Sequence, residues 1–275
     1  MNFFVSIFDR ILYKLEYSKL NILKTLIFNF RTMPFKVAIK LPIFLYGKID
    51  LYLLKSEIEF QDCDIKRGMI KMGMNKDYLG THKGASVFIL REDAKIIFKG
   101  QSEFYSNFLL RTGKGAELTI GKDTLFGNSV KLVCIKKIAI GEGTRIAFEG
   151  QVIDSNFHYI YNLDKEEVKP RETDISIGSY NWIGNRTTIS KGARTNSFTI
   201  VASSSVLSRD YTKNEDKFVV LAGQPAKKVA QNMRRVYNLQ LENELFEYFN
   251  KGNENISEDL KRKIEDSLIS VNIYN

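Results

Sequence analysis

Cysteine is scarce in this chain, which has Cys63 and Cys134 and no other among 275 residues. Two cysteines are too few for a disulfide framework, and they lack the CxxC spacing of metal and redox motifs. We therefore expect two reduced thiols, as is typical of the cytosol, and no metal bound by them.

Long uncharged apolar runs are also missing. The N-terminal stretch "MNFFVSIFDRILYKLEYSKLNILKTLIFNF" carries charges throughout and has no small-residue cleavage signal, so it matches neither a signal peptide nor a membrane span. We expect a cytoplasmic protein. Its 44% hydrophobic and 27% charged residues are typical of a globular chain with a core.

Acidic residues are rare in the N-terminal region. The net charge of the chain is +9, and residues 1–48 hold eight Lys or Arg against Asp9 and Glu16. Apolar residues recur there at helical spacing: Phe4, Ile7, Phe8, Ile11, Leu12, Leu15, Leu23, Leu26, Ile27 and Phe30. The pattern predicts an amphipathic helical segment. It either packs on the protein or a neighbouring subunit, or lies on the anionic inner face of a membrane. Nucleic-acid binding is not indicated, because no recognition motif accompanies the charge.

A repeat with a period of six organises the middle of the chain. Its apolar positions include Ile120, Phe126, Leu132, Ile140, Ile146, Val152, Ile177, Ile183, Ile189, Val201 and Leu207. A six-residue unit is too short for a helix with its own apolar stripe, but it suits one short strand and one corner. Three such units predict a triangular coil in which the aliphatic residues point inward and stack on the next coil. Glycine and serine allow tight corners.

The order of these motifs resembles a known family. The units "ISIGSYNWIGNRTTISKG", "VASSSVLSRD" and "LAGQPAKKV" are similar to those of the hexapeptide-repeat acyltransferases, over roughly residues 65–232. Within that family the chain looks most like the bacterial O-acetyltransferases that modify sugars. The resemblance implies a left-handed parallel β-helix, a homotrimer with active sites between neighbouring β-helices, and acetyl-CoA as the donor.

This organisation predicts three regions: a helical and strand-like N-terminal extension over residues 1–60, a β-helix over 61–225, and a C-terminal helical tail over 226–275. Helical spacing in the tail begins at once after Pro225, with Val229, Met233, Val236 and Leu239.

His158 is the candidate catalytic base. It follows Asp154 and Phe157 in an Asp-x-x-Phe-His segment that, in the family, ends a strand and precedes a protruding loop. No hexad signal falls between His158 and Ile177, which independently predicts a loop there. An imidazole can take the proton of a sugar hydroxyl as the oxygen attacks a thioester. Asp154 is expected either to orient the imidazole or to bind the acceptor. His82 has no such context, and we interpret it as a structural or surface residue.

Coenzyme A carries several phosphates, so its site needs exposed backbone N–H groups and basic side chains. By resemblance, the donor site comprises Trp182, Gly184, Asn185, Ser203, Ser208, Arg209, Lys227 and Lys228. The chain has Ala-Ser-Ser-Ser over residues 202–205, where the family commonly has Gly-Ala-Gly-Ser, so individual contacts are open.

Three functions are consistent with the sequence. The first is O-acetylation, from acetyl-CoA, of a bacterial surface saccharide (capsule, exopolysaccharide or lipopolysaccharide) or of its lipid-linked precursor. The second is N-acetylation of an amino sugar nucleotide, and the third is a trimerisation scaffold without chemistry. A carbonic anhydrase on this coil would need three histidines on one zinc, and the chain has two. No metal is predicted.

Overall fold

The computed structural model describes residues 19–75, 84–213 and 217–272. The chain divides into two compact units, residues 1–233 and 234–275. Within the described residues, the first unit holds the strands and two helices, and the second unit holds a pair of helices. The apolar positions from Phe4 to Leu15, and His82, lie outside the described residues.

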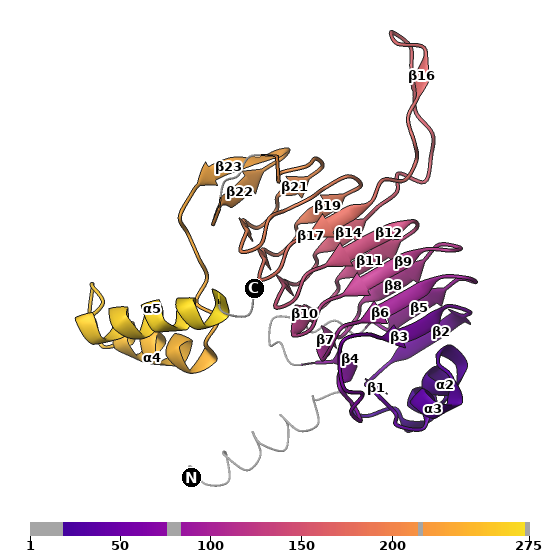
Figure 1. Ribbon diagram of the computed structural model, residues 1–275, viewed down its shortest axis with the longest axis horizontal. Helices are drawn as coiled ribbons and strands as arrows, with labels where there is room; N and C mark the ends of the chain where they lie inside the picture. Colours follow the sequence, from indigo (N-terminus) through magenta and orange to yellow (C-terminus); the bar gives the residue numbers. More distant parts are fainter. Residues whose placement is uncertain (1–18, 76–83, 214–216, 273–275) are drawn as a thin grey trace. The chain divides into compact units, whose positions relative to one another are not determined.

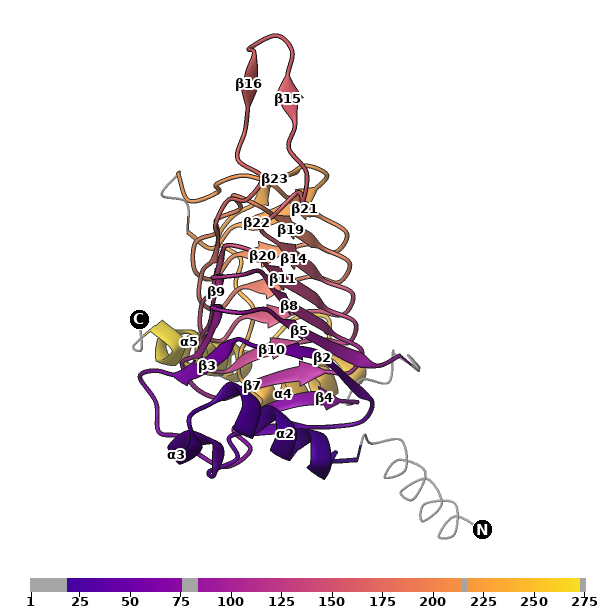
Figure 2. The same cartoon turned by 90° about the vertical axis from the view of Figure 1, so that its right-hand side faces the viewer.

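The first unit is a coil of short strands that form three long sheets (Figures 1 and 2). The nine-stranded sheet contains β1 (Ile43–Leu45), β4 (Ile70–Met74), β7 (Ser102–Tyr105), β10 (Thr124–Phe126), β13 (Arg145–Ile146), β18 (Trp182–Ile183), β20 (Ile200–Val201), β22 (Val220–Gly223) and β23 (Ala226–Ala230). The seven-stranded sheet contains β2 (Ile49–Leu54), β5 (Ser86–Leu90), β8 (Leu109–Thr112), β11 (Lys131–Cys134), β14 (Gln151–Ile153), β19 (Thr188–Ser190) and β21 (Val206–Leu207). The five-stranded sheet contains β3 (Glu57–Phe60), β6 (Lys95–Phe98), β9 (Glu117–Ile120), β12 (Lys137–Ile140) and β17 (Ile175–Ile177).

The chain passes through the three sheets in a fixed order. Strands β12, β13 and β14 belong to the five-, nine- and seven-stranded sheets, and β17, β18 and β19 repeat that order one coil later. Neighbours within these sheets are parallel, apart from the antiparallel pair of β22 and β23. The predicted fold class, a parallel β-helix of hexapeptide repeats with helical extensions, is confirmed.

The hexad positions form ladders inside the coil. Ile140 pairs with Ile120 and Ile177 on the neighbouring coils, and all three side chains are buried. Phe104 and Phe126 stack on each other with their ring centroids 4.0 Å apart. Complete burial of one such side chain contributes about 1.5–3 kcal/mol. A contribution of this kind therefore recurs along the ladder of Ile120, Ile140 and Ile177.

The corners bring successive coils very close together. A Cβ atom added at Gly141 would lie 2.4 Å from the backbone nitrogen of Ser179 on the next coil. This distance is far below van der Waals contact, so the "IGEG" corner requires glycine.

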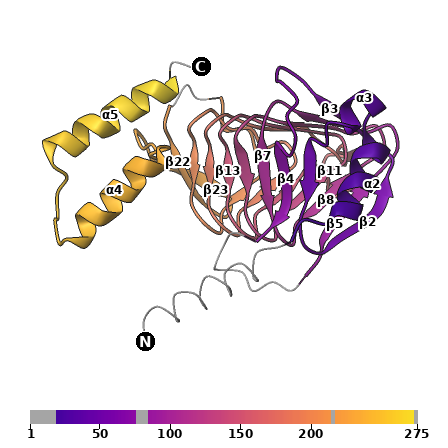
Figure 3. The ribbon, with the colours of Figure 1, turned by 90° about the horizontal axis from the view of Figure 1, so that it is seen from below.

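The coil begins earlier than the sequence predicted. Strands β1, β2 and β3, over residues 43–60, pair in parallel with β4, β5 and β6, so they form a coil within the region assigned to the N-terminal extension. Two helices precede them, α2 (Ile22–Thr32) and α3 (Phe35–Ala38). Figure 3 shows these helices at one end of the stacked strands, where α2 contacts β1 and β2.

The helical tail also begins later than its spacing predicted. Residues 226–230 form β23, because their backbone pairs with β22 and closes the end of the nine-stranded sheet. Helix starts only at α4 (Leu239–Asn250), where the Asn238 side chain caps the N-terminus by accepting from Leu241 N at 3.1 Å. Helix α5 (Glu258–Asn272) follows and packs against α4.

Candidate active site

A long loop leaves the coil where the sequence predicted it, over residues 155–174 between β14 and β17. Figure 2 shows it projecting from the coil as a narrow hairpin, with β15 (Tyr161–Asn162) antiparallel to β16 (Glu167–Val168). The two arms are joined at the root. Asn156 N donates to Arg171 O at 3.1 Å, and Thr173 N donates to Asp154 O at 3.0 Å. The root is therefore held as a closed pair of strands.

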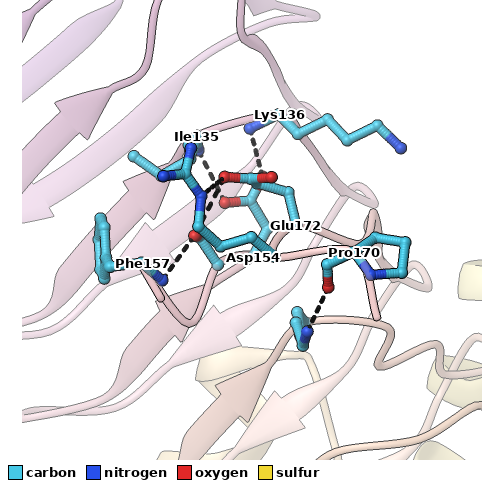
Figure 4. Close-up of polar contacts among 9 residues, drawn as sticks. Ile135, Lys136, Asp154, Phe157, Pro170 and Glu172 are labelled. Carbon is cyan, nitrogen blue, oxygen red and sulfur yellow. Dashed lines mark hydrogen bonds and ion pairs between the residues drawn. The ribbon is translucent and has the colours of Figure 1, made fainter. Parts of the chain in front are cut away.

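His158 lies just beyond this root and is exposed. It lines a pocket of about 580 Å³. The other lining residues are Asn156, Ile160, Tyr161, Asn162, Leu163, Asp164, Lys169 and Lys191. Lys191 comes from the next coil, and its Nζ donates to Pro170 O at 2.7 Å, a contact drawn in Figure 4. The pocket is thus formed by the loop together with one corner of the coil.

The carboxylate of Asp154 binds backbone groups of the coil and not His158. Its oxygens accept from the backbone N–H groups of Ile135, Lys136 and Lys137 at 2.7, 2.8 and 2.8 Å. Figure 4 shows the contacts of Ile135 and Lys136. Asp154 is fully buried, and within the described residues no hydrogen bond joins it to His158. The expectation that Asp154 orients the imidazole or meets the acceptor is therefore not supported. A buried carboxylate binds the nearest unpaired N–H groups, which here belong to the corner before β12.

Burial has a further effect on this carboxyl. It raises the pKa of Asp154 above the ordinary value, although the three backbone N–H donors act in the opposite direction. Asp154 is therefore an anchor for the corner over residues 135–137.

At Phe157 the backbone turns away from the coil. Its φ angle is +62°, a conformation that costs energy for a bulky residue, and its backbone N–H donates to Ser155 Oγ at 2.9 Å. The guanidinium carbon of Arg111 lies 5.3 Å from the centre of the Phe157 ring, within cation–π distance. Together these contacts hold the backbone immediately before His158. Arg111 was not predicted from the sequence, because it lies 46 residues before Phe157 along the chain and has no motif around it.

Half of the predicted donor residues lie at another edge of the coil. Gly184 and Asn185 follow β18, and Ser203 follows β20, so all three are at the edge between the nine- and seven-stranded sheets. A Cβ atom at Gly184 would lie 2.5 Å from Ser203 N, and the side chains of Asn185 and Ser203 are hydrogen-bonded. Trp182 lies beside them on β18 and is exposed. The structure brings these four residues together.

The remaining predicted donor residues lie in two places. Some are at the edge between the seven- and five-stranded sheets, which we call the loop edge because the loop projects from it, and the others are at the end of the coil. Ser208 and Arg209 follow β21, and Arg209 Nη2 donates to Ala226 O at 3.0 Å. Lys227 and Lys228 are exposed on β23, where Lys228 Nζ donates to Gln231 Oε1 at 3.3 Å.

The predicted site residues thus form separate clusters in one chain. His158 belongs to the loop edge, whereas the Gly184 cluster belongs to the next edge of the triangle. Lys169 and Lys191 line the pocket with His158, and neither was predicted from the sequence, because isolated lysines carry no motif. Among the residues in the described ranges, no three His, Cys, Asp or Glu side chains are grouped as metal ligands.

No family model matches the chain, and no curated protein sequence matches it. Solved structures do match. The polySia-specific acetyltransferase NeuO is 17% identical over 77% of this chain and 99% of its own, with a TM-score of 0.43. The polysialic acid O-acetyltransferase OatWY is 19% identical over 72% and 95%, with a TM-score of 0.37. The N-acyltransferase AntD from Bacillus cereus is 13% identical over 75% and 89%, with a TM-score of 0.35. These are acyltransferases, as the sequence motifs suggested, but likenesses this distant do not assign an activity to the chain.

Proposed function

We propose that this protein is an acetyl-CoA-dependent O-acetyltransferase that modifies a hydroxyl of a bacterial surface saccharide (capsule, exopolysaccharide or lipopolysaccharide) or of its lipid-linked precursor. The observation that carries the proposal is an exposed His158 in a pocket of about 580 Å³, held at the root of a loop that leaves a hexapeptide-repeat coil. Stacking of the coil alone requires neither the loop nor the histidine.

His158 would act as the general base. One ring nitrogen accepts the proton of the acceptor hydroxyl while its oxygen attacks the thioester carbonyl carbon. The carbon–sulfur bond then breaks, and the imidazolium returns the proton to the leaving thiolate of coenzyme A. Polar groups around the imidazole, namely Asn156, Asn162 and Lys191, are suited to hold a polyhydroxylated acceptor beside it.

The donor site is proposed to lie in a groove between two copies of the chain. Gly184, Asn185 and Ser203 belong to a different edge from His158, so the two clusters can share one site when the base of one subunit faces the donor cluster of the next. Lys227, Lys228 and Arg209 supply positive charge for the phosphates of coenzyme A. A closed ring of three coils, a homotrimer, satisfies this geometry with identical contacts.

Mixed trimers test the shared site. His158→Ala removes the base, and Ser203→Trp obstructs the donor cluster at an exposed position. Each variant alone should be inactive. Trimers re-formed from a mixture of both should regain transfer, because some interfaces then combine an intact base with an intact donor cluster. Activity that never returns on mixing would contradict a site shared between subunits.

The activity itself is tested with acetyl-CoA and saccharide acceptors. His158→Ala should lower transfer by about 10² to 10⁴, as expected for a lost general base, while acetyl-CoA affinity stays the same. Lys165→Ala serves as a matched control, because Lys165 is exposed on the same loop but does not line the pocket. No turnover with any hydroxyl or amino acceptor would favour the scaffold, and turnover only with amino sugar nucleotides would favour N-acetylation.

We assign the reaction to the cytoplasm, because acetyl-CoA is a cytoplasmic metabolite. Mass spectrometry of the surface saccharide from cells with and without the gene would identify the acceptor through the loss of one acetyl group.

A further inference from the structure

Helix α2 packs on the coil with a polar stripe. Its buried residues are Thr25, Phe28, Asn29 and Thr32, which lie on one side of the helix. Asn29 donates from Nδ2 to Ile43 O at 2.8 Å and accepts at Oδ1 from Ile43 N at 3.2 Å. Thr25 Oγ1 accepts from Leu45 N at 3.0 Å. These bonds satisfy backbone groups of β1, the first strand of the nine-stranded sheet.

The opposite side of α2 is apolar and exposed. Ile22 and Leu23 are 66% and 68% exposed. Phe35, just after the helix, is 69% exposed and lies 5.9 Å from the ring of Phe30. We define the outward face as the exposed apolar residues of α2 and of the turn that follows it: Ile22, Leu23, Leu26, Ile27, Phe30, Phe35 and Ile39.

The charged residues of the chain segment that carries the outward face have one sign. Between Glu16 and Asp50 the sequence has no acidic residue. The exposed basic residues of this stretch are Lys19, Arg31, Lys36, Lys40 and Lys48. Lys24 is engaged within the protein, because its Nζ donates to Ile49 O.

A helix on a water-soluble surface normally buries its apolar side and exposes its polar side. Helix α2 departs from this pattern, because three of its four buried side chains are polar, and two of them, Thr25 and Asn29, bind backbone groups of β1. The resulting apolar patch is unfavourable in water. An anionic bilayer suits both features, because apolar side chains enter the boundary between headgroups and acyl chains while lysine and arginine meet lipid phosphates.

We propose that the outward face binds the surface of an anionic membrane. Within the described residues no helix is long and apolar enough to cross a membrane, so α2 and α3 would lie along its surface. The interaction would hold the amino-terminal end of the coil at the bilayer. It does not depend on the proposed transferase activity, and an inactive protein would bind in the same way.

Vesicle co-sedimentation of the full-length chain tests the proposal. The protein should sediment with vesicles that contain phosphatidylglycerol, less so at high salt, and poorly with phosphatidylcholine alone. The variant Leu23→Gln/Ile27→Gln/Phe30→Gln should bind at least about tenfold more weakly, because three apolar contacts are lost. The variant Lys36→Gln/Lys40→Gln should lose about fivefold for each charge.

A matched control uses three exposed apolar residues of the second unit. The variant Leu239→Gln/Phe246→Gln/Ile269→Gln should bind vesicles as the unchanged chain does, since these residues lie outside the outward face. Circular dichroism and light scattering on every sample check folding and assembly. The proposal is overturned if the folded full-length chain does not bind anionic vesicles, since other residues then cover the face. It is also overturned if the α2 variant alters assembly mass but not vesicle binding, since a second copy then covers it.

Discussion

Replacing Asp154 by asparagine separates a structural role of this residue from a catalytic one. The carboxylate accepts three backbone N–H groups, with Ile135 bound to Oδ1 and both Lys136 and Lys137 bound to Oδ2. The single amide oxygen of Asn can keep the two bonds of Oδ2, but its NH₂ group then faces the N–H of Ile135. A buried N–H without a partner costs about 1–3 kcal/mol.

We therefore expect Asp154→Asn to lower the free energy of unfolding by about 1–3 kcal/mol. Chemical denaturation followed by circular dichroism measures this. Asp174→Asn is a matched control, because Asp174 contacts Lys136 from the surface, with an Nζ–Oδ1 distance of 2.8 Å, and should contribute less than about 1 kcal/mol. Transfer per folded molecule should change little. An unchanged stability together with a loss of activity near 10⁴, as when the orienting carboxylate of a catalytic triad is removed, would refute the structural role.

The pH dependence of this difference has a defined sign. Burial raises the pKa of Asp154 in the folded state above its ordinary value of 3.8. The folded protein therefore holds this proton more tightly than the unfolded chain does. That contribution to stability is fully present below pH 3.8 and is lost as the pH rises through the raised pKa. Because Asn does not titrate, the stability difference between the two proteins should be larger in acid and should shrink as the pH rises toward neutrality.

The remaining predictions concern Gly184, Cys134 and the pair Lys227 and Lys228. Gly184→Ala should destabilise the coil by about 1–3 kcal/mol, because its Cβ would lie 2.5 Å from Ser203 N; thermal unfolding measures this, and an unchanged midpoint would mean that the corner can open. Burial raises the pKa of the Cys134 thiol, so native protein should resist alkylation by iodoacetamide, and mass spectrometry should find Cys134 modified only after unfolding. Acetyl-CoA at a hundredfold excess over its Kd should stabilise the protein by about 2.7 kcal/mol, and Lys227→Ala/Lys228→Ala should weaken that effect. If acetyl-CoA stabilises the unchanged chain and this variant equally, Lys227 and Lys228 do not bind its phosphates.

The repeat predicted most of the coil because one residue in six must face the interior. Positions such as Ile140 and Ile146 needed no three-dimensional information, since their spacing alone defines the ladder. The first coil was not predicted from the sequence, because β1, β2 and β3 lack the glycine that follows the aliphatic residue in later units. The start of the tail was misjudged over residues 226–230, where pairing of β23 with β22 outweighs helical spacing.

The candidate site was less predictable than the coil. The loop and the position of His158 followed from the motif and from the missing hexads. The partners of Asp154 did not, because they belong to a corner 17–19 residues earlier that only the stacking of coils brings near. The separation of Gly184 from His158 likewise depends on which edge of the triangle each residue reaches.

The closed root of the loop has a consequence for evolution and engineering. Strand β12 pairs with β17 in unbroken register, Ile138 with Ile175 and Ile140 with Ile177, although the whole loop lies between them. The pairing of β12 with β17 therefore does not depend on the length of the loop. Doubling the length of a flexible loop adds only about 0.6 kcal/mol of closure entropy. Insertions, deletions or transplanted hairpins between residues 159 and 170 keep His158 and can reshape the pocket around it while leaving the folding of the coil unchanged. This part of the loop is therefore the place where the choice of acceptor can change with the least effect on stability.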